Sequence, residues 1–255
     1  MTVYASNQDR TLEYLKKFDR KTTLQFLIKS NKPIIFDVGA NMGSSLLEFK
    51  KYWPGSIVHC FEPQEECWSS LEKIQVDSQE GSVFINKEAA GNVVSKNKVF
   101  YTHDVSNGIS GFNKVNMESK DSIELSKRSG DQDARHEYSK AFNHERMIST
   151  VRLDDYCHDR DIKKLDLLKI DTQGFEPEVL EGFGASLKNI SVVLTELMFY
   201  DYYDRSVSFS DIEKHLLPAG FKIYDINHIS KNPMNGRTDW VDVIYVNEEC
   251  IRDAK

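Results

Sequence analysis

The fold is decided by the stretch Asp37-Val38-Gly39-Ala40-Asn41-Met42-Gly43, which follows the apolar run Pro33–Phe36. The apolar run predicts a buried strand, and the two glycines predict a tight turn that leads into a helix over residues 44–52. Glycine adopts positive φ readily and lets a ligand lie close to the main chain. The stretch therefore predicts a strand, a turn and a helix, with a ligand bound at the turn.

A second signal is Phe61-Glu62-Pro63, which closes the next predicted strand, Ile57–Phe61. Glu62 follows Asp37 by 25 residues. Doubly wound folds place a carboxylate that holds ribose hydroxyls about 20 residues after the glycine turn. The two signals together predict an adenosine-containing cofactor at the carboxyl ends of two neighbouring parallel strands.

The glycine spacing indicates which cofactor is bound. A dinucleotide site has the pattern G-x-G-x-x-G, in which backbone amides meet a pyrophosphate. This chain has G-x-x-x-G instead, with Asp37 two residues before the first glycine. An acid there would repel a pyrophosphate but suits a cation such as a sulfonium that carries an ammonium group. The spacing therefore favours S-adenosylmethionine over NAD, and it disfavours an NAD-dependent sugar oxidoreductase.

Composition sets the broad class of protein. The chain has 255 residues, 40% of them hydrophobic and 29% charged, with a formal net charge of −7. These values fit one large α/β domain and do not favour a nucleic-acid partner, since phosphate binding relies on clustered Lys and Arg. No apolar run approaches the ~18 residues of a membrane span, and the N-terminus lacks a signal-peptide pattern. We expect a cytoplasmic protein with reduced cysteines.

Strand and helix patterns alternate from residue 34 onward, which predicts an α/β fold with a doubly wound, mostly parallel sheet and helices on both faces. Residues 1–32 are expected to form an N-terminal helical extension, with a helix over 7–30, and residues 33–255 the main domain. Within that domain, residues 113–150 carry many charges of both signs and few large apolar side chains. We expect either a solvated insertion or a lid over the site.

Two more carboxylates follow predicted strands. Asp171 comes directly after the apolar strand Leu165–Ile170, and Glu196 ends the strand Ser191–Glu196. Ligands of open α/β sheets gather at the carboxyl ends of the strands. We therefore expect Asp171 and Glu196 to face the same crevice as Asp37 and Glu62.

The chain resembles the FkbM-type methyltransferases. The resemblance is carried, in order, by Asp37–Gly43, Phe61–Pro63, Thr150–Tyr156, Leu168–Glu176 and Val179–Gly182. It extends over residues 33–230 and implies a class I, Rossmann-like fold with seven strands. It also implies an S-adenosylmethionine-dependent O-methyltransferase that acts on hydroxyls of saccharides or other secondary metabolites. Two places depart from the commonest pattern: Gln173 replaces Glu, and the serine-rich block is reduced to Gly108–Phe112.

The resemblance assigns cofactor-binding residues along the chain. The methionine end would lie against Asp37, Gly39 and Gly43, the ribose against Glu62, and the adenine near Glu88-Ala89-Ala90. The full predicted cofactor set is Asp37, Gly39, Ala40, Asn41, Gly43, Glu62, Glu88, Ala89 and Asp171.

Methyl transfer to an alcohol needs a group that takes the hydroxyl proton. Asp171 is the first candidate base, and Glu196 is the second, or binds substrate hydroxyls. The alternative bases are His103, His136 and His144, which lie before or inside the charged segment. Asp171 and Glu196 could instead share a divalent metal, since oxygen ligands suit Mg²⁺, although no complete ligand set is evident.

The sequence therefore predicts an S-adenosylmethionine-dependent O-methyltransferase that modifies a sugar or glycan hydroxyl. A polyketide or another small secondary metabolite is the alternative acceptor. A protein that binds an adenosyl ligand without catalysis is the alternative from a different class. A homodimer, formed through a strand edge or the N-terminal helices, is possible.

Overall fold

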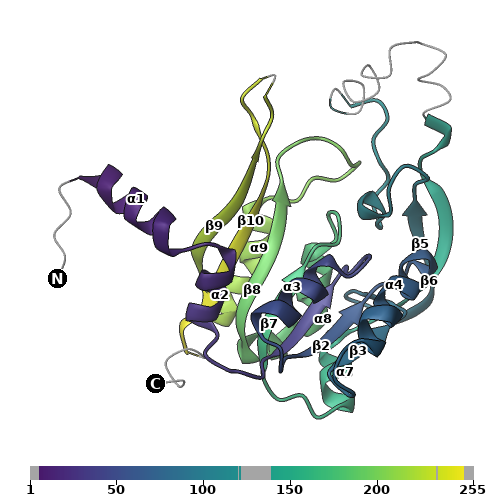
Figure 1. Cartoon of the computed structure of the whole chain (residues 1–255). Coiled ribbons are helices and arrows are strands. Elements are labelled where there is room, and N and C mark those ends of the chain that lie inside the picture. Colours follow the sequence, from purple (N-terminus) through teal and green to yellow (C-terminus); the bar gives the residue numbers. More distant parts are fainter. Residues whose placement is uncertain (1–5, 120, 122–138, 234, 250–255) are drawn as a thin grey trace.

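A twisted seven-stranded sheet forms the centre of the computed structural model, which describes residues 6–119, 121, 139–233 and 235–249. The strand order is β3-β2-β1-β7-β8-β10-β9 (Figure 1). The strands are β1 Ile34–Val38, β2 Ile57–Phe61, β3 Val83–Asn86, β7 Leu165–Ile170, β8 Ile190–Met198, β9 Phe221–Lys231 and β10 Thr238–Asn247. β10 runs in the direction opposite to the other six strands of this sheet. The predicted seven-stranded, mostly parallel sheet is confirmed.

The helices are α1 Asn7–Lys17, α2 Arg20–Leu27, α3 Ser44–Tyr52, α4 Glu65–Val76, α7 Leu153–Asp159, α8 Glu176–Phe183 and α9 Phe209–Leu216, with short 3₁₀ turns η1 Asn107–Ile109, η2 Gly184–Asn189 and η3 Leu217–Ala219. All of the α-helices except α1 cover the faces of this sheet. One core lies under α2, α3 and α4 and contains Leu24, Phe49 and Leu71. The other lies under α7, α8 and α9 and contains Leu153 and Phe183. Strands buried on both faces explain the nearly continuous apolar runs in the sequence.

The N-terminal segment differs from the single helix expected over residues 7–30. The chain breaks at Phe18-Asp19, and the Asp19 carboxylate accepts a hydrogen bond from the Thr22 amide at 2.7 Å, which caps α2. Helix α2 buries Leu24 and Leu27, whereas α1 has no buried residue and projects from the body of the molecule (Figure 1). Asp19 has a strong preference for the N-cap position, so it starts a second helix.

A second, three-stranded sheet stands beside the main one, with the order β4-β6-β5 (Figure 1). Its strands are β4 Ala89–Ala90, β5 Ser95–Thr102 and β6 His144–Val151. The charged segment 113–150 therefore ends in regular structure. Sequence reasoning missed β6 because four of its eight side chains, at its start, are exposed, so it lacks the apolar signature of a buried strand. No helix in the described part of the chain has both the length and the apolar character that a membrane span requires.

Helix α8, which packs on the main sheet, approaches the backbone after β4 of the second sheet closely. A Cβ added at Gly182 in α8 would lie 2.2 Å from the carbonyl oxygen of Gly91, which follows β4. Such an overlap with backbone forces the helix to move. Replacing a helical glycine by alanine normally stabilises a helix by up to about 1 kcal/mol. At Gly182 the overlap should make the same replacement destabilising.

We expect Gly182→Ala to lower the free energy of unfolding by about 1–3 kcal/mol, the usual cost of overpacking. Urea denaturation measures the change. Ser69→Ala, at an exposed position of α4, is the control and should stay within about 0.5 kcal/mol of the wild type. Equal stability of the two variants would show that α8 is not held against Gly91.

Candidate functional site

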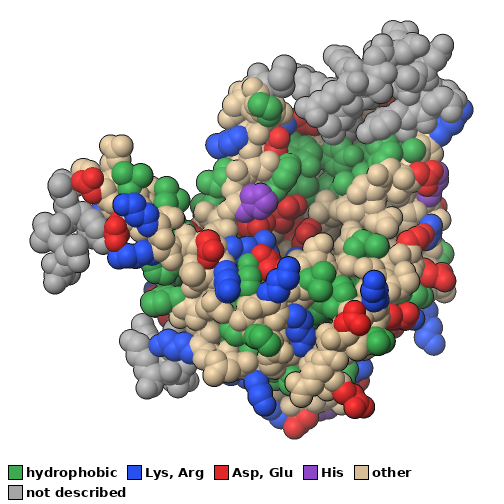
Figure 2. All heavy atoms as spheres, viewed as in Figure 1, with side chains coloured by type: hydrophobic (Ala, Val, Ile, Leu, Met, Phe, Trp, Pro, Cys, Tyr) green, Lys and Arg blue, Asp and Glu red, His purple; other side chains and the backbone are tan. Residues whose placement is uncertain are grey.

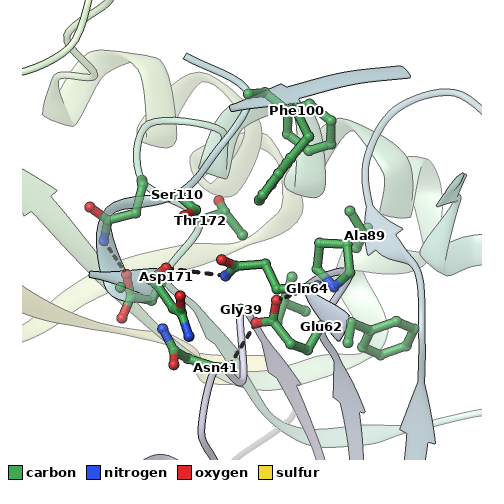
Figure 3. A pocket seen from close by; sticks show the side chains of 17 residues that line it. Gly39, Asn41, Glu62, Gln64, Ala89, Phe100, Ser110, Asp171 and Thr172 are labelled. Atoms are coloured by element: carbon green, nitrogen blue, oxygen red, sulfur yellow. Dashed lines mark hydrogen bonds between the residues drawn. The ribbon is translucent and has the colours of Figure 1, made fainter. Parts of the chain in front are cut away.

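A cleft opens at the carboxyl ends of β1, β2 and β7. Gly39 and Asn41 line it from the turn after β1, Glu62 from the end of β2, Ala89 from β4 and Asp171 from the end of β7 (Figure 3). The structure thus brings five of the nine predicted cofactor residues together in one cleft.

Glu62 is held in place by two backbone amides. Its Oε2 accepts from the Asn41 amide at 2.8 Å, and its Oε1 accepts from the Gln64 amide at 2.9 Å (Figure 3). Burial raises the pKa of this carboxyl, and the two amide donors oppose the rise. The carboxylate therefore joins the turns after β1 and β2 and still lines the cleft with part of its acceptor capacity free.

Asp171 is also fixed in several directions. Its amide donates to the carbonyl of Val38 at 3.0 Å, and its Oδ1 accepts from Gln173 Nε2 at 2.8 Å. The ammonium of Lys169 lies 3.6 Å from its Oδ2. Tyr203 Oη donates to Gln173 Oε1 at 2.7 Å and so fixes the amide that holds Asp171. Asp171 is therefore a preoriented carboxylate at the rim of the cleft.

The structure places Asp37 behind the cleft instead of in its lining. Its carboxylate is fully buried and pairs with Lys169 Nζ at 3.2 Å. Burial raises the pKa of Asp37, and Lys169 opposes the rise. Burial alone would lower the pKa of Lys169, but Asp37 and Asp171 raise it overall. Lys169 Nζ also donates to the Gly39 carbonyl at 2.9 Å. The pair therefore fixes the position of the glycine turn.

The other three predicted cofactor residues also lie outside the lining of the cleft. Ala40 is buried in the core under α3. Gly43 has a φ of +87° at the start of α3, and a Cβ there would lie 2.6 Å from Ile74 Cδ1, so it allows α3 to pack on α4. Glu88 is partly exposed beside Ala89.

A second cavity lies on the other side of Asp171. Glu196 from β8 lines it together with Trp240 and Asp242 from β10, and Asp171 lines both spaces. Figure 2 shows acidic side chains gathered in a hollow of this face, with histidine and basic side chains beside them. Glu196 and Asp242 stand directly opposite one another in the strand register. Burial, then Asp171 and Asp242, raise the pKa of Glu196 to about 9.

Two side chains important to the site were not selected from the sequence. Glu176 accepts from the amides of Thr172 and Gly174 at 2.8 and 3.2 Å, and so fixes the loop after Asp171. Ser110 lines the cleft, and its Oγ is buried without a hydrogen-bond partner among the described residues. Glu176 could have been found from the first-turn position it occupies after the turn Thr172–Gly174. Ser110 comes from a loop with no periodic signal.

Of the histidine candidates, His103 and His144 do not line the cleft. His103 is buried, its Nδ1 accepts from the Asn143 amide at 3.1 Å, and burial lowers its pKa to about 4. His144 pairs with Asp104 at 3.3 Å on the surface. His136 lies outside the described residues. Among the residues that the structure describes, no group of three or more His, Cys, Asp or Glu side chains could hold a metal ion.

Comparisons with known proteins agree with this geometry. Residues 37–223 match the Methyltransferase FkbM domain. The chain is 23% identical over 191 residues to the 2-O-methyltransferase NoeI of Sinorhizobium fredii (strain NBRC 101917 / NGR234), a match that spans 70% of this chain and 68% of that protein.

A solved structure is similar over almost the whole chain. The methyltransferase FkbM from Methylobacillus flagellatus KT superposes with a TM-score of 0.54 at 17% identity and covers 92% of this chain. The present chain spans half the length of that one. This likeness shows the class I methyltransferase fold, and the match over residues 37–223 shows that the chain belongs to the FkbM methyltransferase family.

Proposed function

We propose that this protein transfers a methyl group from S-adenosylmethionine to a hydroxyl of a sugar or glycan. One observation carries the proposal: Asp171 lines both the cleft that contains Glu62 and the second cavity that contains Glu196. A cofactor in the cleft and an acceptor in the cavity would meet at this carboxylate.

The residues of the cleft fit an adenosyl ligand. Glu62 offers a fixed carboxylate for two ribose hydroxyls, the role that an acid after the second strand has in doubly wound folds. Ser110 Oγ is a buried polar atom that gains a hydrogen-bond partner when a polar ligand fills the cleft. Ala89 and Phe100 give the cleft an apolar wall of the kind that accommodates a flat base.

The cofactor would supply a methyl group activated by the positive sulfonium. The protein's own contribution is to align the acceptor oxygen with that methyl, which accounts for about 7–11 kcal/mol of barrier in well-oriented reactions. Asp171 takes the hydroxyl proton as the oxygen attacks, and a positioned base adds about 10²–10⁴-fold. The donor from Gln173 and the nearby Lys169 ammonium hold Asp171 ready for this role.

The chemistry of the cavity favours a polar acceptor. Carboxylates and basic groups line it, and Trp240 forms part of its wall. An apolar polyketide would leave the charged groups without partners, which is costly once water is excluded. Hydroxyls of a saccharide satisfy such groups, and its C–H faces pack on an aromatic ring. The 2-O-methyltransferase similarity supports transfer to oxygen.

The proposal is tested by incubating the protein with methyl-labelled S-adenosylmethionine and a panel of mono- and oligosaccharides, with mass detection of methylated product. We expect methylation of at least one saccharide, and Asp171→Asn should lower kcat by about 10²-fold or more, since the base is lost. Calorimetry should show S-adenosylmethionine binding by this variant. Full turnover by Asp171→Asn would exclude it as the base, and binding of NAD in place of S-adenosylmethionine would refute the proposal.

Glu62→Gln should weaken S-adenosylmethionine binding about tenfold or more, because charge-assisted hydrogen bonds to the ribose are lost. Titration calorimetry measures the change in Kd. The control is Glu65→Gln, which removes the same charge from an exposed position in the first turn of α4. If both variants bind as the wild type does, Glu62 is not the ribose ligand.

Glu196→Gln tests the protonation of the second cavity. The folded protein keeps this carboxyl protonated up to about pH 9, whereas the unfolded chain releases the proton above its ordinary pKa of 4.5. Glu196 therefore lowers stability progressively as the pH rises from about 5 to 9. We expect the Tm of the variant to exceed that of the wild type by a margin that grows over this range. A margin independent of pH would contradict the shifted pKa.

A further inference from the structure

The second cavity extends across four strands of the main sheet. The end of β7, then β8, β10 and β9 contribute to its lining, respectively with Asp171, Glu196, Trp240 and His228. These strands are consecutive in the sheet, and β9 is its edge (Figure 1). Neighbouring strands lie about 4.8 Å apart, so three intervals place the His228 end of the cavity roughly 14 Å from the Asp171 end. The cavity is therefore longer than the reacting hydroxyl and its base require.

His228 reaches the cavity because β9 is bulged at this residue. In the register with β10, Asn227 stands opposite Asp242. The next pair joins Ile229 to Val241, so His228 is an extra residue between two consecutive pairs. Successive side chains of a regular strand point to opposite faces. In a regular strand the residue after Asn227 would point away from the cavity, whereas the bulge turns His228 into its lining.

The backbone of His228 is strained, with a φ of +43°. Few residues other than glycine adopt a positive φ, and such strain is found most often at functional sites. The side chain is 61% exposed, and its Nδ1 lies 3.7 Å from Asp242 Oδ2, which is longer than a hydrogen bond. The fold therefore gains little from this side chain, although its backbone holds an unfavourable conformation.

We propose that His228 binds a second sugar unit of the acceptor, which is therefore an oligosaccharide or a glycan chain and not a free monosaccharide. This inference rests on the proposed function, because it assumes a saccharide in the cavity. A sugar ring covers about one interval between strands, so a ring methylated beside Asp171 does not reach β9. A neutral imidazole offers one donor and one acceptor, and both suit sugar hydroxyls. Trp240 lies on β10, between the two ends, where its ring can pack on a sugar face.

The position of His228 suits selection of the acceptor and not the methyl transfer itself. Three strand intervals separate it from Asp171, which is too far for a hydrogen bond to the reacting oxygen. It also follows the family-matched residues 37–223, so the shared family domain does not include it. A contact to a remote part of a substrate that is equally strong in the ground state and the transition state changes KM and leaves kcat unaltered. We therefore expect His228 to act chiefly on the KM for the acceptor.

The test compares monosaccharides with disaccharides that contain them, glucose with cellobiose and maltose, and galactose with lactose, using methyl-labelled S-adenosylmethionine. We expect the wild type to methylate a disaccharide with a KM about tenfold or more below that of its monosaccharide. His228→Ala should raise the disaccharide KM about tenfold, with a smaller change in kcat, because hydrogen bonds to the second sugar are lost. His158→Ala, which removes an exposed histidine from α7, should keep the wild-type KM values.

His228→Gly separates binding from a role in the fold. Glycine adopts a positive φ without strain, so the Tm should equal or exceed that of the wild type while the disaccharide KM rises as in His228→Ala. Asparagine tolerates a positive φ and keeps hydrogen-bonding groups, so the KM of His228→Asn should lie between those of His228→Ala and the wild type.

The contrary outcomes can be told apart. A lower Tm for His228→Gly, with both acceptors affected equally, would show that the residue serves the fold. Equal KM values of the wild type for a monosaccharide and its disaccharide, or a disaccharide KM that no His228 variant changes, would overturn the inference and leave the proposed function intact. Methylation of no saccharide would refute the proposed function and this inference together.

Discussion

The site depends on one buried ion pair, between Lys169 of β7 and Asp37 of β1. The two residues are neighbours in the strand register, and Lys169 also holds the Gly39 carbonyl. A charge buried without a partner costs several kcal/mol, so neither residue is stable there without the other. The pair therefore fixes the glycine turn against the end of β7, where Asp171 begins the next loop.

Backbone contacts extend this constraint across the rim of the sheet. Asp171 donates from its amide to Val38, Glu62 accepts from the Asn41 amide, and Glu176 accepts from the Thr172 amide. The loops after β1, β2 and β7 are thus tied to one another by buried carboxylates and amides. A cleft built in this way presents its polar groups already oriented, and preorganised polar groups lose little energy to rearrangement during reaction.

The sequence predicted those parts of the molecule that have a local signature. Apolar runs located β1, β2, β7 and β8 of the main sheet, and strand-end position predicted that Glu62 and Asp171 line one cleft. It could not predict contacts between distant segments, such as the pairing of Arg20 with Asp242, 222 residues away. Asp37 shows the same limit: its position suggested a ligand contact, but only the fold reveals that Lys169 lies against it.

Asp171 and Glu196 lie on the same rim of the sheet but have different neighbours. Asp171 has an ammonium and an amide donor beside it, which stabilise its charge. Glu196 faces Asp242 across the strand pair and lies near Asp171, so burial and like charge keep it protonated at neutral pH. Glu196 can therefore donate a hydrogen bond at neutral pH. Because the charge of Asp171 contributes to the protonation of Glu196, a ligand that places a cation between them would change both groups at once.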